Sequence, residues 1–460
     1  MIYKSIFREY DIRGVVPKEL NEQSVKNIAY FFALEVQRRL NKDIVIAIGY
    51  DARVHSKELF SYVISGLNKA NCQVLSMGMV ATGVNYFSGF NTIDKYDIDA
   101  TIMITGSHNP PCYNGLKMNI KNRPFFQNDI YTLRDIILDK NIQIEDNHNY
   151  IKIDVKTPYK NYMLNQFSHL KNMKQKFAID CGNGVANTVL GDILNKLELD
   201  YISLYAKPDG LFPNHHPNPS DENNLIDLQT VLKDDIEYGF AYDGDADRVI
   251  LLTQNNIVKG DIMGILFAST MINPIVVGEV KCSQVMYDVI NANGGKTIMY
   301  KIGHSNSKAK LYEENATLGV EVAGHICFND RYFGFDDGIY VTLRVLELIY
   351  NGMDIDKEIE KLPKVYSSEE ISISTSEDKK FILINKIKEL LKNPPKQFLK
   401  IVDIIDIDGL RIVFEDGWAL VRASNTTPVL VTRFESTNEK KVKIYKENIK
   451  ILIDMAKDSL

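Results

Sequence analysis

Short apolar segments alternate with longer amphipathic segments over most of the chain. The pattern predicts strands at 43–48, 73–77, 177–180, 238–242, 249–253, 275–280 and 297–301, and helices at 56–68, 185–197 and 284–292. Strands that alternate with helices are typical of α/β layers. The same plan returns three times, so the sequence predicts three similar mixed α/β domains in succession.

The last part of the chain follows a different pattern. A polar linker at 362–370 precedes a strand that begins at Ile371 and a helix at 381–392, which Pro394 ends. Short strands at 408–414, 418–422 and 429–435 and a helix from about Glu439 follow. This pattern predicts a smaller α+β domain. We therefore expect four domains, at 1–150, 151–255, 256–365 and 366–460.

Composition limits the classes of protein to which the chain can belong. At 460 residues it is too long for a single core, and 45% hydrophobic and 25% charged residues are ordinary for a globular protein. The formal net charge of −6 argues against a nucleic-acid-binding surface. The cysteines are scattered without a C-x-x-C pair, and no uninterrupted apolar stretch indicates a signal peptide or membrane span. We expect a cytoplasmic monomer that binds small molecules and neither nucleic acid nor membranes.

An acidic loop between two predicted strands is the first candidate for chemistry. Asp243, Asp245 and Asp247 alternate with small residues, so a turned or extended loop can bring their carboxylates to one side. An EF-hand calcium loop would need glycine and glutamate where this chain has Arg248 and Gln254. Three hard oxygen ligands suit Mg²⁺, and a solvated acidic turn is the alternative for the loop taken alone.

A second loop follows the apolar run at 101–104 and displays Ser107 between Gly106 and His108. Glycine lets a backbone turn sharply and approach a phosphate. A seryl phosphate carries about −1.5 to −2 charges, which the acidic loop would repel without a cation between them. The two loops together predict a phosphoserine beside a divalent metal ion.

Two other roles of Ser107 need to be considered. A serine in a turn or at a helix N-cap is common. A Ser–His hydrolase pair is disfavoured, because we expect adjacent side chains to point apart and the G-x-S-x-G elbow is absent. His108 is more plausible as a hydrogen-bond donor to phosphate.

Other segments are rich in groups that bind anions or sugars. The loop at 422–428 contains an arginine, an amide and several hydroxyls, which suits a second phosphate, although an ordinary polar turn has the same composition. The segment Phe7 to Gly14 contains two arginines and a tyrosine, and a surface salt-bridge network is its alternative. Further candidates are Lys281, His304, Glu321 and His325.

In this order the motifs resemble those of the α-D-phosphohexomutases, and most closely the bacterial phosphomannomutase/phosphoglucomutase branch. The motifs are F-R-E-Y-D-I-R-G, T-G-S-H-N-P, D-G-D-A-D-R, Y-F-G-F-D-D-G and R-A-S-N-T-T-P, and they span nearly the whole chain. The resemblance implies four domains around a central cleft, the first three alike and the fourth smaller and mobile. It also implies an isomerase that transfers a phosphoryl group within its substrate.

The resemblance assigns roles to individual residues. Ser107 would carry the phosphate, and Mg²⁺ would be held by a phosphoserine oxygen with Asp243, Asp245 and Asp247. The reacting phosphoryl group would be lined by Arg13, His108, Lys117 and Arg248. The sugar and its other phosphate would be bound by Arg8, Tyr10, Lys281, His304, Glu321, Arg422, Ser424, Asn425 and Thr426. Proton transfer is assigned either to Lys117, with its pKa lowered by Arg13 and Arg248, or to His325.

The implied reaction moves phosphate between O1 and O6 of glucose, mannose or both. A hexose 1,6-bisphosphate would form on the enzyme, turn end for end, and also serve as activator. The family's sugar loop usually reads G-E-x-S-G-H, whereas this chain has Val320 and Ala323 in that loop, which leaves the preferred hexose open. Asn425 and Thr427 disfavour an N-acetylglucosamine substrate. The alternatives are a phosphatase with an aspartyl nucleophile and a non-catalytic sugar-phosphate-binding protein.

Overall fold

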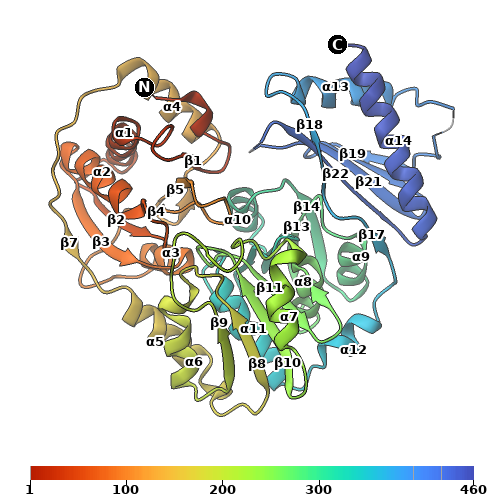
Figure 1. Cartoon of the computed structure of the whole chain (residues 1–460), viewed down its shortest axis with the longest axis horizontal. Helices are drawn as coiled ribbons and strands as arrows, with labels where there is room; N and C mark the ends of the chain where they lie inside the picture. The colour runs from red at the N-terminus through yellow and green to blue at the C-terminus, as the bar shows by residue number, and fades with distance from the viewer. Residues whose placement is uncertain (1, 397, 426) are drawn as a thin grey trace.

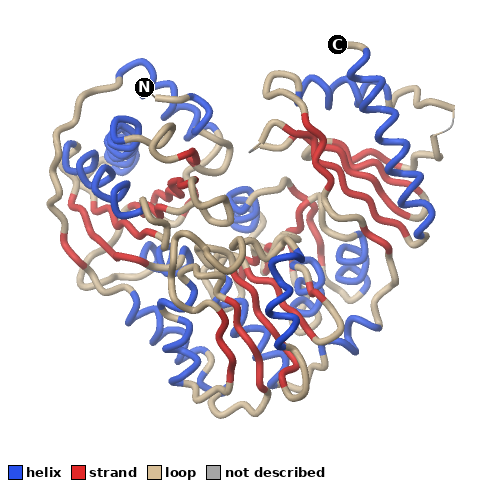
Figure 2. Tube along the Cα trace, in the orientation of Figure 1, coloured by secondary structure: helices blue, strands red, loops and turns tan. Residues whose placement is uncertain are grey.

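The computed structural model describes residues 2–396, 398–425 and 427–460. Figure 1 shows an arc of three α/β units, with the C-terminal unit facing the N-terminal one at the upper ends of the arc. Figure 2 shows that sheets form the centre of each unit, with helices against them. Among the described residues, no helix has the length and apolar character needed to cross a membrane.

The first unit is a seven-stranded mixed sheet in the order β1-β5-β4-β2-β3-β7, with β6 paired to β5. Its strands are β1 (Ile12–Val15), β2 (Val45–Tyr50), β3 (Gln73–Met79), β4 (Ala100–Ile104), β5 (Tyr113–Ile120), β6 (Arg123–Pro124) and β7 (Ile151–Lys152). Its helices are α1 (Glu22–Leu40), α2 (Ser56–Lys69), α3 (Thr82–Phe90) and α4 (Asn128–Lys140). The parallel strands β2, β3 and β4 are almost wholly buried, as expected for a sheet covered on both faces.

The second unit is a five-stranded sheet in the order β12-β11-β10-β8-β9. Its elements are α5 (Lys156–Gln166), β8 (Lys176–Asp180), α6 (Leu190–Lys196), β9 (Tyr201–Leu204), α7 (Ile226–Val231), β10 (Ile236–Tyr242), β11 (Val249–Thr253) and β12 (Ile257–Val258). The helix predicted at 185–197 is a 3-10 turn, Ala186–Thr188, followed by the short helix α6. The Thr188 hydroxyl bonds back to the Val185 carbonyl, which favours the tighter turn.

The third unit has four strands in the order β14-β13-β15-β16. Its elements are α8 (Gly260–Ala268), β13 (Ile275–Glu279), α9 (Gln284–Ala292), β14 (Lys296–Tyr300), α10 (His304–Glu313), β15 (Leu318–Val320), β16 (Ile326–Phe328), α11 (Gly338–Tyr350) and α12 (Ile355–Glu360). One apolar cluster runs from Leu75 in the first unit through Phe240 in the second to Leu346 in the third. The first three units therefore share a continuous core.

The fourth unit is an antiparallel sheet in the order β17-β22-β21-β20-β19, with β18 also paired to β22. Its elements are β17 (Tyr366–Ser367), β18 (Ile371–Ser374), α13 (Lys380–Leu390), β19 (Asp403–Ile405), β20 (Leu410–Phe414), β21 (Gly417–Ala423), β22 (Val429–Ser436) and α14 (Glu439–Asp458). Helices α13 and α14 pack with the sheet around an apolar cluster of their own. The predicted fold class of three mixed α/β units and a smaller α+β unit is confirmed.

Candidate active site

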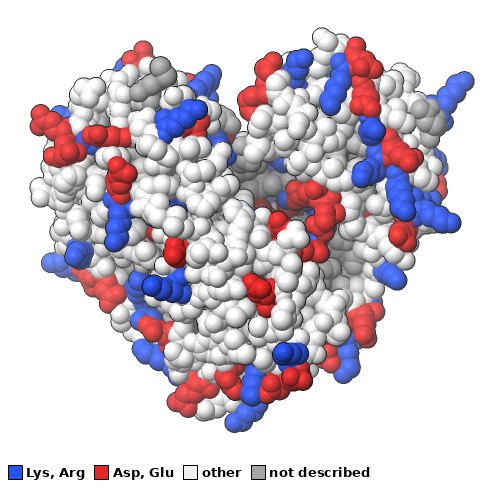
Figure 3. All heavy atoms as spheres, viewed as in Figure 1, with Lys and Arg blue, Asp and Glu red and all other residues white. Residues whose placement is uncertain are grey.

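A cavity of about 920 Å³ lies between the four units, and each of them contributes to its wall. Figure 3 shows the hollow between the two upper lobes, with acidic side chains gathered in it. The predicted site residues that line this cavity are Arg8, Tyr10, Arg13, Ser107, His108, Lys117, Arg248, Lys281, His304, Glu321, His325, Arg422, Ser424 and Asn425. Thr426, also predicted to bind phosphate, lies outside the described residues. Residues distant in sequence are therefore brought to one chamber.

Ser107 follows the carboxyl end of β4, at the floor of the cavity. Its side chain is packed and not displayed as expected, since the residue is only 1% exposed. The Oγ atom donates to Asp243 Oδ2 at 2.8 Å and lies 3.0 Å from His108 Nδ1. The expectation that the side chains of Ser107 and His108 point apart is wrong. Ser107 has a left-handed φ of 48°, and this turn of the backbone brings its Oγ to the imidazole.

Two buried residues that sequence reasoning missed hold the loop around Ser107. The Arg53 guanidinium donates to four backbone carbonyls of this segment, at distances of 2.6 to 3.0 Å; the acceptors are Ser107, Asn109, Pro110 and Tyr113. The Asp51 carboxylate accepts hydrogen bonds from the Thr105 hydroxyl and the Gly106 amide. A Cβ at Gly106 would lie 2.5 Å from Arg53 Cζ, so this glycine makes room for the arginine.

The acidic loop lies between β10 and β11, directly beneath Ser107. Asp243, Asp245 and Asp247 are fully buried, and one oxygen from each lies within 4.8 Å of the other two. Burial, together with the charges of Asp245 and Asp247, raises the pKa of Asp243 well above its usual range. Among the described residues, Asp245 Oδ1 and Asp247 Oδ1 have no hydrogen-bond partner. Unpaired buried carboxylate oxygens at this spacing fit a divalent cation, which prefers oxygen ligands.

Lys117, on β5, lies against the same carboxylates. Its Nζ donates to Asp245 Oδ2 at 2.7 Å and to Asp247 Oδ2 at 2.5 Å. Burial alone would lower the pKa of Lys117, but the charges of Asp245 and Asp247 outweigh it and raise the pKa. The prediction that Arg13 and Arg248 lower this pKa is therefore wrong, because the aspartates are in direct contact with the ammonium group.

Positive and neutral donors surround the approach to Ser107. Arg13 is buried, forms an ion pair with Asp11 and donates to Asn109 Oδ1 at 2.6 Å. Burial, with the positive charges of Arg248 and Arg13, lowers the pKa of His108 well below its usual range, so its imidazole is neutral. Within the described part of the chain, no hydrogen bond or ion pair engages the guanidinium of Arg8. This group is thus free to bind an anion.

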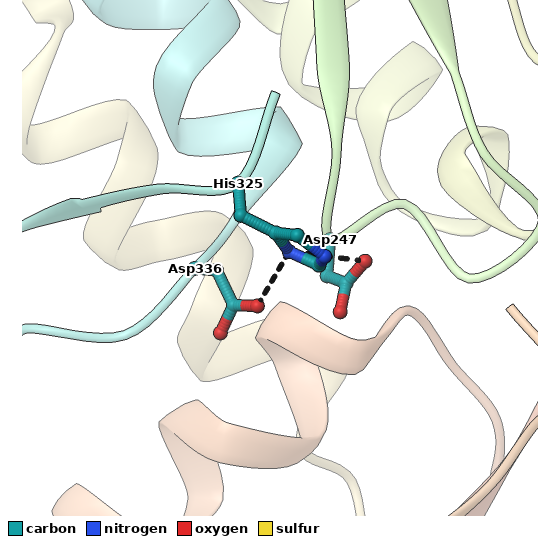
Figure 4. Close-up of side chains that lie close together, drawn as sticks. All are labelled: Asp247, His325 and Asp336. Atoms are coloured by element: carbon teal, nitrogen blue, oxygen red, sulfur yellow. Dashed lines mark ion pairs between the residues drawn. The ribbon is translucent and has the colours of Figure 1, made fainter. Parts of the chain in front are cut away.

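His325 lies between Asp247 and Asp336 (Figure 4), with its Nδ1 2.8 Å from Asp336 Oδ2 and 3.7 Å from Asp247 Oδ1. On the other side of the ring, Nε2 accepts a hydrogen bond from Arg248 Nε at 2.9 Å. Lys308 donates to the second oxygen of Asp336 at 2.8 Å and neutralises its charge. These contacts favour the Nδ1–H form of the imidazole.

Sequence reasoning missed Lys308 and Asp336. Asp336 falls within the motif at 332–338, whose resemblance to the family assigns no role to this residue. Nothing in the sequence around Lys308 indicates that its ammonium group would be buried.

The cavity is also lined by the residues predicted to bind the sugar and its other phosphate. Lys281 Nζ donates to Glu370 Oε1 at 2.7 Å, and Arg422 pairs with Asp408. His304 is buried, and among the described residues its Nε2 has no hydrogen-bond partner. Asn425 Nδ2 donates to the Tyr10 hydroxyl at 2.6 Å, which joins the fourth unit to the first across the cavity.

The third unit positions the predicted sugar reader. Glu321 Oε1 accepts from the Ser307 hydroxyl at 2.8 Å. Glu279, which sequence reasoning missed, accepts from the Val322 amide, and burial raises its pKa to about 8. Of the two unusual residues in the sugar loop, Val320 is buried in β15, whereas Ala323 lines the cavity.

Family models cover almost the whole chain. Three described as phosphoglucomutase/phosphomannomutase alpha/beta/alpha domains I, II and III match residues 4–141, 157–256 and 259–366, and the C-terminal domain model of the same family matches 370–451. The chain belongs to the phosphoglucomutase/phosphomannomutase family.

Individual members of this family are similar over their full lengths. A phosphomannomutase/phosphoglucomutase from Pseudomonas aeruginosa is 37% identical over 445 residues, which is 95% of this chain and 93% of that protein. A phosphoglucomutase from Neisseria meningitidis is 36% identical over 462 residues, with 98% and 97% coverage. The crystal structure of a phosphoglucomutase/phosphomannomutase family protein from Burkholderia thailandensis superposes with a TM-score of 0.89 at 34% identity, covering 99% of this chain and 98% of that one.

The predicted activity is confirmed at the level of the family. The chain is a hexose-phosphate mutase, an isomerase that transfers a phosphoryl group between positions of a small sugar phosphate. An aspartyl-nucleophile phosphatase and a non-catalytic binding protein are not favoured. The acidic group under Ser107 is suited to a metal ion.

Proposed function

We propose that Ser107 is the reusable phosphoryl carrier of this mutase and that glucose phosphates, mannose phosphates or both are its substrates. The observation that carries this proposal is the position of Ser107 Oγ, 2.8 Å from Asp243 at the floor of a cavity lined by basic side chains. The printed names of the relatives, phosphomannomutase/phosphoglucomutase and phosphoglucomutase, support these two hexoses. The proposal also includes the division of the chain into domains at 1–150, 151–255, 256–365 and 366–460.

The reaction needs a carrier because O1 and O6 of a hexose are too far apart for one in-line displacement. In the first step the free hydroxyl attacks the phosphorus of phospho-Ser107, the bond from phosphorus to Oγ breaks, and a hexose 1,6-bisphosphate forms. The hydroxyl gives up its proton, and the Ser107 oxygen accepts one. After the bisphosphate turns end for end, the same step in reverse returns the other phosphoryl group to Ser107.

The phosphoryl group would lie among Arg13, Lys117, Arg248 and neutral His108. Three cations offset the charge that spreads over the phosphoryl oxygens during transfer, and His108 can donate a hydrogen bond without adding charge. Lys117 serves as an ammonium group in this arrangement, because its two aspartate partners keep it protonated. Lys117 is therefore not the proton acceptor.

Asp243, Asp245, Asp247 and an oxygen of phospho-Ser107 would hold Mg²⁺. In the unphosphorylated enzyme, the Ser107 hydroxyl donates a hydrogen bond to Asp243 Oδ2. Phosphorylation removes that proton and places anionic oxygens against the carboxylate, so a cation is required to offset the repulsion. Bound Mg²⁺ supplies charge neutralisation of the phosphoryl oxygens.

His325 is the residue to which we assign proton transfer. Its Nδ1 faces Asp336 and its Nε2 faces Arg248 at the cavity wall, which leaves Nε2 as the basic atom. Asp336 would hold the ring in this orientation, in the way that carboxylates orient catalytic imidazoles. Glu321, which also lines the cavity, would bind sugar hydroxyls. The other phosphate would be bound by Arg8, Tyr10, Lys281, His304, Arg422, Ser424, Asn425 and Thr426.

The test compares wild type, Ser107→Ala and the control Ser168→Ala, which removes an exposed hydroxyl of the second unit. Turnover of glucose 1-phosphate and mannose 1-phosphate is measured with Mg²⁺ and trace hexose 1,6-bisphosphate. We expect Ser107→Ala to be inactive. Wild type and the control should carry an adduct of about 80 Da, one phosphoryl group, at residue 107, and Ser107→Ala should lack it. Activity of Ser107→Ala, or an adduct on an aspartate that hydroxylamine removes, would refute the proposal.

A further inference from the structure

The segment 205–225, called here the His215 loop, connects β9 to α7 and lies against both catalytic loops. The Phe212 ring packs against the Arg53 guanidinium at 5.2 Å, under the phosphoserine loop. A Cβ added to Gly244, in the acidic loop, would lie 3.6 Å from the same ring. Gly210 approaches the first unit so closely that a Cβ there would lie 2.5 Å from the Ala52 carbonyl. The His215 loop thus contacts both the loop that would carry the phosphate and the acidic loop that would hold the metal.

His215 fixes this loop to the second unit. Its Nε2 lies 2.9 Å from Asp180 Oδ2, at the carboxyl end of β8, and its Nδ1 lies 3.0 Å from the His216 carbonyl. Both partners are hydrogen-bond acceptors only, so both bonds form only when both ring nitrogens carry protons. The other Asp180 oxygen accepts from the Gly182 amide. The geometry therefore selects the imidazolium form of His215.

His216 continues the connection to the active site. This residue lines the cavity, as does His108, the neighbour of Ser107. The glycine turn that follows Asp180 supports the metal side, because the Val185 amide donates to the Gly244 carbonyl at 3.1 Å. Asp180 and His215 thus support segments that contact both the phosphoserine loop and the acidic loop, although neither residue lines the cavity.

We infer that His215, held as an imidazolium between Asp180 and the His216 carbonyl, is a positioning residue that sets the phosphoserine loop for phosphoryl transfer. This inference rests on the proposed role of Ser107. In the proposed function, the sugar and its other phosphate are bound by side chains that neither His215 nor Asp180 contacts, so the pair acts on the transfer step and not on affinity.

The charges around His215 support this role. Burial lowers the pKa of His215, but its hydrogen bond and charge interaction with Asp180 outweigh burial and raise the pKa above the usual value. The other titratable groups facing the ring are Asp227, whose charge also raises the pKa, Tyr205, whose ring packs edge-on at 5.4 Å, and His216. Above the raised pKa one of the two bonds is lost. The contacts therefore hold the loop while both ring nitrogens carry protons, and they weaken once the pH rises above the raised pKa.

The test uses full-length phosphorylated enzyme with Mg²⁺ and compares wild type, Asp180→Asn, His215→Phe and the control His169→Gln. Asp180→Asn keeps the shape and removes the charge. The control breaks another histidine–carboxylate contact, between His169 and Glu347 at 3.0 Å, outside the cavity. We measure kcat and KM for glucose 1-phosphate against pH, and the protonation of ring nitrogens by ¹⁵N NMR, for which eight histidines are few enough to assign.

We expect kcat of Asp180→Asn to fall about tenfold, as for a reacting group misplaced by a fraction of an ångström, with KM unchanged. The alkaline limb of its profile should move to lower pH, and the control should match wild type. Wild-type His215 should carry two ring protons at neutral pH. A neutral His215, or folded Asp180→Asn with wild-type kcat and pH profile, would overturn the inference. Phosphate on Ser107 in these variants would leave the proposed function standing in either case.

Discussion

Replacing Arg53 by lysine tests whether the phosphoserine loop depends on a fork of hydrogen bonds. The guanidinium is fully buried and donates to the four backbone carbonyls of the loop. Lysine keeps the positive charge and most of the volume, but its donors all lie on one nitrogen atom. The four carbonyls are positioned to accept from two different nitrogen atoms of the planar guanidinium. One ammonium group cannot reach all four of them.

The expected magnitude follows from the lost bonds. A hydrogen bond to a charged group contributes about 1.5 to 3 kcal/mol, so losing two of the four weakens the loop by about 3 to 6 kcal/mol. The Phe212 ring also loses its stacked guanidinium. Because Ser107 itself is an acceptor of one of these bonds, its Oγ moves relative to Asp243, and we expect kcat to fall about 100-fold.

Steady-state kinetics and hydrogen exchange of the peptide 105–113 measure the two effects separately. Arg53→Lys should exchange faster in this peptide than wild type and show the lower kcat. Arg38→Lys, on the surface of α1 where a single Glu35 pairs with the arginine, is the matched control and should change neither. Wild-type exchange and wild-type kcat in Arg53→Lys would show that the fork does not hold the loop.

Three further changes have defined outcomes. Burial raises the pKa of Asp337 to about 6 from 3.8, so this carboxyl lowers the free energy of unfolding by about 2 kcal/mol as pH rises from 4 to 6. Asp337→Asn should remove that slope, and calorimetry at pH 4 and 6 would contradict this if the slope stayed. Tyr10→Phe removes the hydroxyl that accepts the Asn425 bond across the cavity, so KM should rise up to about fivefold at unchanged kcat, and an unchanged KM counts against a closing role. Chelation should abolish turnover and Mg²⁺ should restore it, whereas full activity in EDTA excludes the proposed metal.

The sequence contained enough information to predict most strands and the groups at their ends. Ser107 and Asp243 each follow an apolar strand, and the carboxyl ends of β4 and β10 bring the two residues within hydrogen-bond distance. Motifs of this kind consist of residues that are adjacent in sequence, so their chemistry can be predicted from the sequence alone. Arg53 could not be found in this way, because its acceptors lie more than fifty residues further along the chain and its own surroundings in sequence resemble an ordinary helix start.

The prediction of the pKa of Lys117 failed because a pKa shift depends on distances between charged groups, and the sequence does not give these distances. Arg13 and Arg248 line the same cavity as Lys117, but Asp245 and Asp247 contact the ammonium group directly. The conformation of Ser107 was likewise out of reach, since a left-handed serine is uncommon and is imposed here by the contacts of its loop. The pKa of Lys117 and the backbone conformation of Ser107 both depend on residues that are distant in sequence and close in space.

The two halves of the site differ in how they are built, and this difference bears on how a bisphosphate can turn. Ser107 and the acidic loop belong to units that share one continuous core. Arg422 and Asn425 belong to the fourth unit, which has its own core and meets the third through Trp418 and the buried Arg411, whose Nη1 donates to the carbonyls of Val280 and Cys282.

Small rotations at such a junction can move Arg422 and Asn425 away from the cavity while leaving Ser107 and its aspartates in register. A phosphate released by these two residues then exchanges with the one near Ser107 before the fourth unit returns. The predicted mobility of the fourth unit, which stays a prediction, would in this way serve reorientation without disturbing the transfer site.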